Sequence, residues 1–205
     1  MDTQVLPIHD PQALAAAIDI LNSGGLVAFP TDTVYGLGAL VFDEQAVARL
    51  YDVKERGIEK AIPVLIGDTE QLGRVSSGVN LIGQKLAERF WPGALTIVVP
   101  RHPGIPEAVT TLPTVGVRMP DFASTLELLR LIGPLAVTSA NISGQSSPST
   151  AAGVKAQLGG RIPLILDGGV TPGGLPSTVV DCTTGKPLIL REGPLSLEQI
   201  LQALK

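Results

Sequence analysis

A dense group of hydrogen-bonding side chains lies in the stretch "FPTDTVYGLGAL", residues 29–40. Thr31, Thr33 and Tyr35 supply hydroxyl groups and Asp32 supplies a carboxylate, with apolar segments on both sides. Hydroxyl groups both donate and accept hydrogen bonds, whereas an ionised carboxylate only accepts them. This concentration of polar groups favours a site that orients a polar ligand.

Three basic residues, Lys54, Arg56 and Lys60, crowd the end of a predicted helix and the loop after it. The helix dipole favours cations at this end, so a solvated capping cluster explains them if the segment stands alone. The alternative is an anion site, because one charge pair at about 4 Å contributes about 4 kcal/mol at an effective dielectric of about 20. Several converging cations would then hold a polyphosphate.

Two further polar segments are "TSANISG" at 138–144 and "DGGVTPGGLPSTVVD" at 167–181. Turn chemistry explains the first in isolation, and a loop without chemistry explains the second. Arg118 and Arg191 likewise follow apolar runs, "VGV" and "LIL". Because open α/β sheets bind ligands at strand ends, these segments predict one convergent pocket.

Several catalytic patterns are absent from the sequence. It contains no GxxxxGK[ST], and "GLGALV" is not GxGxxG, so it indicates neither a P-loop nor a Rossmann fingerprint. His9 and His102 lie outside the polar segments and no GxSxG occurs, which disfavours a Ser/His/Asp triad. No CxxC motif or histidine cluster has metal-ligand spacing, so we predict no metal ligands from the protein. What remains is orientation and charge stabilisation.

Apolar segments rich in β-forming residues alternate with helical patterns along the chain. Predicted strands cover 26–29, 63–66, 95–99, 115–118, 135–139, 162–166, 177–181 and 188–191, and predicted helices begin after Asp10, Asp43 and Ser196 and cover 79–90, 124–132 and 150–158. This alternation predicts an α/β fold with helices covering a sheet. No repeat or linker is evident, so we expect one domain, 1–205.

Composition narrows the class of protein. The chain has 205 residues, one cysteine and a formal charge of −4. This charge disfavours a general nucleic-acid binder, because neutralising phosphates supplies most non-specific affinity. No apolar run reaches about 18 residues and the amino terminus does not resemble a secretion signal, so we expect a soluble, cytoplasmic protein with no membrane association.

Taken together, the motifs resemble the YrdC/TsaC family, the L-threonylcarbamoyladenylate synthases. The resemblance rests, in family order, on "PTDTVYGLG", "KERGIEK", "FWPGALTIVV", "VGVRMPD", "TSANISG", "DGG" with "PSTVVD", and "LREGP". It implies a twisted, open, mixed sheet flanked by helices, with a large concave basic cavity.

The resemblance also implies a reaction. L-threonine, bicarbonate or CO₂, and ATP with Mg²⁺ would give threonylcarbamoyl-AMP and pyrophosphate. A threonylcarbamoyl transferase complex would then modify the tRNA adenosine beside the anticodon, and direct tRNA binding by this chain is not expected.

The family's site residues carry over to matching positions. For threonine, the resemblance implies Thr31, Tyr35, Arg118, Thr138 and Ser177. For ATP it implies Lys54 and Arg56, which would also stabilise charge in catalysis, together with Ser139, Asn141 and Arg191. No protein nucleophile is required.

Some features depart from the family pattern and leave alternatives open. Leu65 and Phe122 stand where histidine occurs in other members, and Ala61 replaces a frequent proline. The chain ends shortly after "LREGP", so we expect the second domain of longer members to be absent. One alternative is a non-catalytic RNA-binding module in tRNA or ribosome maturation; another is a carbamoyl-adenylate enzyme with a different acceptor.

Overall fold

The structure is a computed structural model and describes residues 2–55, 57, 61–171 and 175–205. Its strands are β1 (Gln4–Pro7), β2 (Val27–Phe29), β3 (Gly36–Leu40), β4 (Val64–Leu65), β5 (Leu95–Pro100), β6 (Thr114–Arg118), β7 (Leu135–Ser139), β8 (Leu164–Asp167), β9 (Thr178–Asp181) and β10 (Leu188–Arg191). Its helices are α1 (Pro11–Asn22), α2 (Glu44–Lys54), α3 (Leu72–Val75), α4 (Leu81–Phe90), α5 (Ala123–Ile132), α6 (Ala151–Leu158) and α7 (Leu197–Gln202), with a 3₁₀ turn at Thr69–Gln71.

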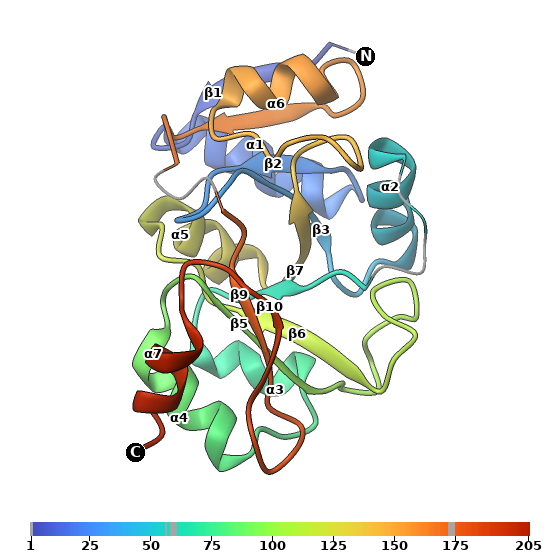
Figure 1. The fold of residues 1–205 in the computed structure, drawn as a ribbon. Coiled ribbons are helices and arrows are strands. Elements are labelled where there is room, and N and C mark those ends of the chain that lie inside the picture. The colour runs from blue at the N-terminus through green and yellow to red at the C-terminus, as the bar shows by residue number, and fades with distance from the viewer. Residues whose placement is uncertain (1, 56, 58–60, 172–174) are drawn as a thin grey trace.

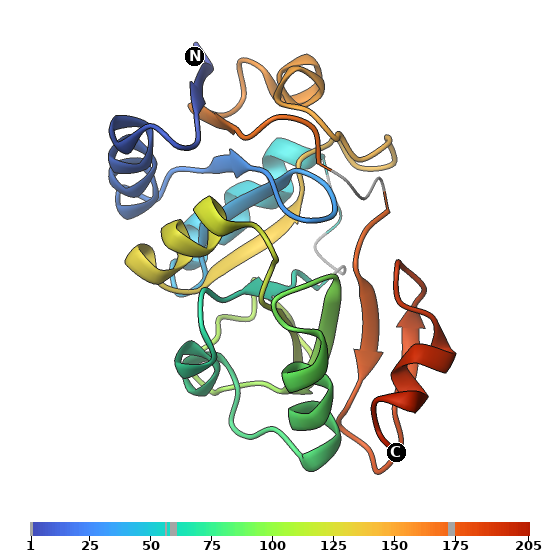
Figure 2. The same cartoon turned by 90° about the vertical axis from the view of Figure 1, so that its left-hand side faces the viewer.

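All the strands named above belong to one mixed sheet, in the order β1-β8-β2-β3-β7-β4-β6-β5-β9-β10 (Figure 1; Figure 2 gives the view turned by 90°). Strands β1, β8 and β2 are parallel, and β3 and β7 continue the sheet with antiparallel pairing. The short strand β4 joins this half to β6, β5, β9 and β10. The predicted α/β fold, a twisted mixed sheet flanked by helices, is confirmed.

Side-chain alternation gives the first half of the sheet two apolar faces. On β2, Ala28 belongs to one apolar cluster, which also contains buried residues of α2 and α6. Its neighbours Val27 and Phe29 belong to the other cluster, with buried residues of α1 and α5. Because successive residues of a strand point to opposite faces, both faces of this half must be covered by helices.

The second half of the sheet is covered differently. On β5, Leu95 and Ile97 pack in the first cluster with residues of α4. The intervening Thr96 and the following Val98 point to the second face, where they line a groove of about 240 Å³. The second face therefore changes, along the sheet, from a helix-covered apolar surface to an open groove. The groove is lined mainly by apolar side chains, and its polar members are Thr96, Thr110, Thr114 and Arg191.

This arrangement revises how the polar segments meet. Strand β6 is parallel to β4, whereas β4 is antiparallel to β7, so β6 and β7 run in opposite directions. Arg118 and Ser139 consequently end strands at opposite edges of the sheet. Arg118 and Ser139 nevertheless line one cavity, because side-chain alternation turns both toward the second face.

Local sequence signals set several helix ends. The side chains of Asp10 and Asp43 accept hydrogen bonds from the first turns of α1 and α2. Ser196 and Gln199 form the capping box predicted at the start of α7. In the described part of the chain, no helix combines the length and apolar character needed to cross a membrane.

A close backbone approach explains the glycine of "LREGP". A Cβ atom on Gly193 would lie 2.4 Å from the Thr178 nitrogen and 2.6 Å from the Pro176 carbonyl oxygen. These are backbone atoms, which cannot rotate away as a flexible side chain does. Gly193 thus allows the segment after β10 to lie against the chain that carries Ser177.

We expect Gly193→Ala to destabilise the protein by about 1–3 kcal/mol, because a Cβ there forces two backbone segments apart. Urea unfolding measures the change. Gly185→Ala is the matched control, since nothing lies within 4 Å of its added Cβ. Equal stability of the two variants would contradict this account of Gly193.

Candidate active site

The second face of the sheet carries a cavity where its two halves meet. It encloses about 170 Å³ and adjoins the groove described above, sharing Thr96 and Arg191 with it. The resemblance implies a large cavity, whereas the described side chains enclose one below the roughly 300–1,000 Å³ of typical ligand pockets. Six residues predicted for the site line it: Thr31, Arg118, Thr138, Ser139, Ser177 and Arg191.

Arg118 is the most constrained charged group of the cavity. It ends β6 and is 6% exposed. Its Nε donates to the Gly93 carbonyl oxygen at 2.9 Å, and its Nη1 donates to Thr33 Oγ1 at 2.9 Å. Its Nη2 donates to the carboxylate of Asp32 in an ion pair. These bonds in three directions fix the plane of the guanidinium beside the cavity.

Burial and two neighbouring charges act on Arg118. Burial lowers the pKa of the Arg118 guanidinium, the Asp32 carboxylate opposes this shift, and the charge of Arg191 adds to it. Arginine nevertheless stays protonated at neutral pH. Arg118 and Arg191 both line the cavity, so an anionic ligand would meet two positively charged side chains there.

The loop between β2 and β3 presents hydroxyl groups to the cavity. Thr31 Oγ1 donates to the Val34 carbonyl oxygen at 2.7 Å and lies 3.0 Å from Thr33 Oγ1. It also accepts from the Thr33 and Val34 amides. Thr31 and Thr33 are both buried, so the loop is held rigidly by its own hydroxyl groups before any ligand binds.

A second polar group closes the opposite side. Ser177 Oγ lies 2.8 Å from Thr96 Oγ1, so either hydroxyl donates to the other. Arg191 Nη2 donates to the Ser177 carbonyl oxygen at 2.9 Å and to Ser177 Oγ at 3.1 Å. Ser177 and Thr96 are buried, whereas Arg191 is exposed. This group joins β5, β9 and β10 at the cavity wall.

Lys54 lies behind the cavity rather than in its lining. It ends α2, is 1% exposed, and its ammonium donates to the carbonyl oxygens of Ser139 and Asn141. The amide of Ser143 in turn donates to the Lys54 carbonyl oxygen at 2.8 Å. Lys54 therefore holds the segment 139–143 in shape. Arg56, which was predicted with it, lies outside the described residues.

Asn141 has an asymmetric environment. Its Nδ2 donates to the carbonyl oxygens of Ile142 and Gln145, both at 2.8 Å. Its Oδ1 is buried and accepts no hydrogen bond among the described residues. Buried polar groups are nearly always paired, so this oxygen is an available acceptor.

Tyr35 does not line the cavity, although the resemblance assigns it to the threonine pocket. It is fully buried, and its hydroxyl donates to the Gly169 carbonyl oxygen at 2.8 Å and accepts from the Gly168 amide at 3.2 Å. Burial is the main cause that raises the pKa of Tyr35 to about 12. Tyr35 thus links its loop to the turn that begins at Asp167.

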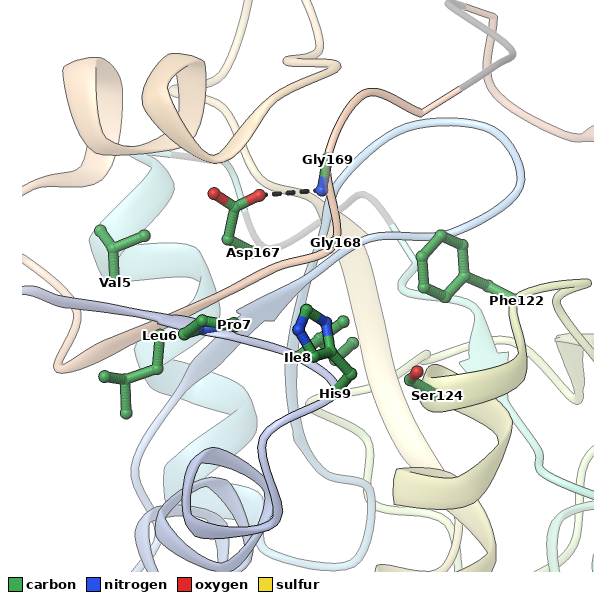
Figure 3. Close-up of a pocket in the computed structure, with 10 residues that line it drawn as sticks. All are labelled: Val5, Leu6, Pro7, Ile8, His9, Phe122, Ser124, Asp167, Gly168 and Gly169. Atoms are coloured by element: carbon green, nitrogen blue, oxygen red, sulfur yellow. Dashed lines mark hydrogen bonds between the residues drawn. The ribbon is translucent and has the colours of Figure 1, made fainter.

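That turn borders a second hollow of about 540 Å³, shown in Figure 3. Its lining is mainly apolar, from β1 and Phe122, with His9, Ser124 and Asp167 as polar members. In Figure 3 the Asp167 carboxylate turns to its own loop, where it accepts from the Gly169 amide at 2.8 Å. No predicted site residue lines this hollow, so we place the candidate active site in the arginine-lined cavity.

The described residues do not form a metal centre by themselves. No group of three or more His, Cys, Asp or Glu among them could hold an ion. Asp32, a carboxylate beside the cavity, is already paired with Arg118.

Sequence reasoning left three residues of the site without a role: Asp32, Thr33 and Thr96. The first two lie inside the conspicuous "PTDTV" motif, so their position was a usable signal. Thr96 lies in the apolar run "LTIVV", where a single hydroxyl facing one side of a strand was the only sign. All three hold an arginine or a serine of the cavity in place.

Comparisons with known proteins identify the family of the chain. The model of the Sua5/YciO/YrdC family, described as "Telomere recombination", matches residues 19–193. A Pyrococcus abyssi protein named threonylcarbamoyl-AMP synthase is 44% identical over 90% of this chain and 55% of its own length. A Mycobacterium tuberculosis protein named putative threonylcarbamoyl-AMP synthase is 38% identical over 98% of this chain and 95% of its own.

The fold also matches solved structures. The Pyrococcus abyssi Sua5 structure complexed with L-threonine aligns with a TM-score of 0.95 and 40% identity, covering 98% of this chain and 61% of that one. The chain thus spans little more than half the length of some relatives that it matches. On the family model and these identities, the chain belongs to the Sua5/YciO/YrdC family.

Proposed function

We propose that the chain makes L-threonylcarbamoyladenylate from L-threonine, bicarbonate or CO₂, and ATP, and releases pyrophosphate. The product would serve threonylcarbamoyl modification of the tRNA adenosine beside the anticodon. One observation carries the proposal: a buried, fully oriented arginine faces a small cavity in a chain whose fold matches a threonine-bound relative. A guanidinium in that setting suits the carboxylate of an amino acid.

Threonine binding would use the rigid polar walls. Arg118 would hold the α-carboxylate, with Thr31, Thr138 and Ser177 supplying hydrogen bonds around the substrate. Because the 30–35 loop and the Ser177 group are internally bonded, these groups are ordered without ligand. Such preorganisation lowers the entropy lost on binding. Tyr35 would act from behind, by fixing the loop that carries Thr31.

The chemistry requires no protein nucleophile. The threonine amine, once deprotonated, attacks the carbon of CO₂ and forms a carbamate. A carbamate oxygen then attacks the α-phosphorus of ATP, and the bond to the pyrophosphate oxygen breaks. The chain would supply orientation and positive charge, which stabilise the negative charge that develops on the phosphoryl oxygens.

The nucleotide would lie over the segment Ser139–Asn141 with Arg191 beside it. The ammonium of Lys54 contacts this segment, where it donates hydrogen bonds to the carbonyl oxygens of Ser139 and Asn141. Its charge would therefore favour phosphates bound above, and Arg56 would add to it. Mg²⁺ would enter with ATP, held by phosphate oxygens and water, as is usual for this ion.

The wider biological setting follows from the same proposal. The consumer of the product would be a threonylcarbamoyl transferase complex acting on tRNA. The cytoplasm is the proposed compartment, because the chain has one cysteine and the substrates are ATP and a free amino acid. One domain, 1–205, is the proposed organisation, which a single continuous sheet supports.

The direct test incubates the purified protein with MgATP, bicarbonate and labelled L-threonine. We expect pyrophosphate release that depends on threonine and bicarbonate, with label appearing in a nucleotide adduct. Pyrophosphate and the adduct are measured by coupled assay and mass spectrometry. RNA binding without threonine-dependent pyrophosphate release would instead favour the RNA-binding module.

Arg118→Lys should weaken threonine binding by at least about 10-fold, because lysine cannot reproduce three fixed hydrogen-bond directions. Calorimetry with L-threonine measures the affinity, and thermal unfolding checks that the variant is folded. The exposed Arg89→Lys is the control and should bind as the wild type does. Normal threonine affinity in Arg118→Lys would refute the carboxylate assignment.

Lys54→Met should lower the free energy of unfolding by about 1–3 kcal/mol, because two buried carbonyl oxygens lose their donor. It should also weaken binding of a non-hydrolysable MgATP analogue more than binding of threonine. Lys155→Met removes an exposed lysine of α6 and serves as the control. A Lys54→Met variant with unchanged stability would contradict the anchoring role.

A further inference from the structure

The wall of the cavity between the two halves of the sheet is apolar. Ala61, Pro63 and Leu65 alternate along the chain into β4, and all line the cavity. Val137 of the adjacent β7 lines it as well. Leu65 is 4% exposed and Val137 is 5% exposed, whereas Pro63 is half-buried and Ala61 is exposed. These side chains form an apolar strip, which is therefore densely packed at Leu65 and Val137.

Leu65 has a fixed position relative to Arg118. The two residues are register partners in the parallel pair β4·β6. Register partners on neighbouring strands project to the same face of the sheet, about 4.8 Å apart in the hydrogen-bonding direction. A carboxylate held by Arg118 therefore brings the rest of the ligand close to Leu65.

The other walls of the cavity carry most of its polar side chains, together with the apolar Val34 and Pro176. Thr31 and Thr33 lie on one side, and Ser177 with Thr96 lies on another. Threonine carries a hydroxyl and a methyl group on its Cβ, which need a polar and an apolar contact respectively. The strip offers an apolar contact directly beside Arg118, because Leu65 is the register partner of Arg118 and both line the cavity.

We propose that Leu65, supported by Val137, is the residue that selects a substrate with a methyl group on Cβ, and so selects threonine over serine. The inference rests on the proposed function and adds the basis of its specificity. Leu65 contacts the methyl group and excludes water from it, whereas serine leaves this volume unfilled. One such methyl group changes discrimination by about 10- to 200-fold.

The test compares the affinities of L-threonine and L-serine by calorimetry in three proteins: wild type, Leu65→Ala and Leu135→Ala. Leu135 is the matched control, because it pairs with Leu65 in register and packs in the same apolar cluster but does not line the cavity. Both variants lose the same atoms from the same core. A general loosening of the core therefore affects them alike.

We expect the wild type to prefer threonine by at least about 10-fold, and Leu65→Ala to reduce this ratio at least fivefold. Leu135→Ala should keep the wild-type ratio even if its stability falls. If Leu65→Ala does not fold, Leu65→Val, a milder change, should give a smaller reduction of the ratio.

The outcomes separate this inference from the proposed function. An unchanged ratio in a folded Leu65 variant would overturn the inference and leave the function intact, as would an equal fall in Leu135→Ala. Absence of any threonine binding by the wild type, with MgATP and bicarbonate present, would overturn both.

Discussion

The buried guanidinium of Arg118 is the constraint on which the site depends. A charge that is almost fully removed from water is tolerated only when it is paired and hydrogen-bonded. The chain meets this requirement from two directions, with Asp32 and Thr33 of the loop after β2 and with the carbonyl of Gly93 before β5. Of these partners, Thr33 itself lines the cavity. The groups that pair with the Arg118 charge therefore also help to shape the cavity.

The strong mixing of strand directions makes this arrangement possible. In a parallel sheet, polar residues after the strands gather at one edge. Here β6 and β7 run in opposite directions, and the site lies on a face of the sheet instead. The face is free of a helix interface at Thr96 and Val98, where the adjoining groove lies. The cavity therefore marks the boundary between a covered half and an open half of the same surface.

Many of the helices and strands could be predicted from the sequence, because they depend on local signals. Strand and helix patterns located most elements, and capping residues such as Asp10, Asp43 and Ser196 marked helix starts. Strand β3 was not recognised, because its alternating glycines carry little β propensity. A side chain at Gly36 would collide with Val137, and one at Gly38 would collide with Phe29. These contacts form only in the folded sheet, so the sequence alone does not reveal why glycine is required.

The site was predictable as a set of residues but not as a set of contacts. The motif resemblance grouped Thr31, Arg118 and Ser177, and all three line one cavity. It could not indicate that Lys54 faces carbonyl oxygens or that Tyr35 faces a glycine turn. Such details depend on burial and on partners distant in sequence, which no local pattern encodes.

Lys54 and Tyr35 both support one short segment of the cavity wall. The carbonyl of Tyr35 accepts from the amide of Ala140, while the ammonium of Lys54 binds the carbonyls on either side of that residue. The segment is thus held by the loop that carries Thr31 and by α2. Because the two supports bond to consecutive residues, a shift of either would displace the same backbone atoms, and Ser139, which lines the cavity, would move with them.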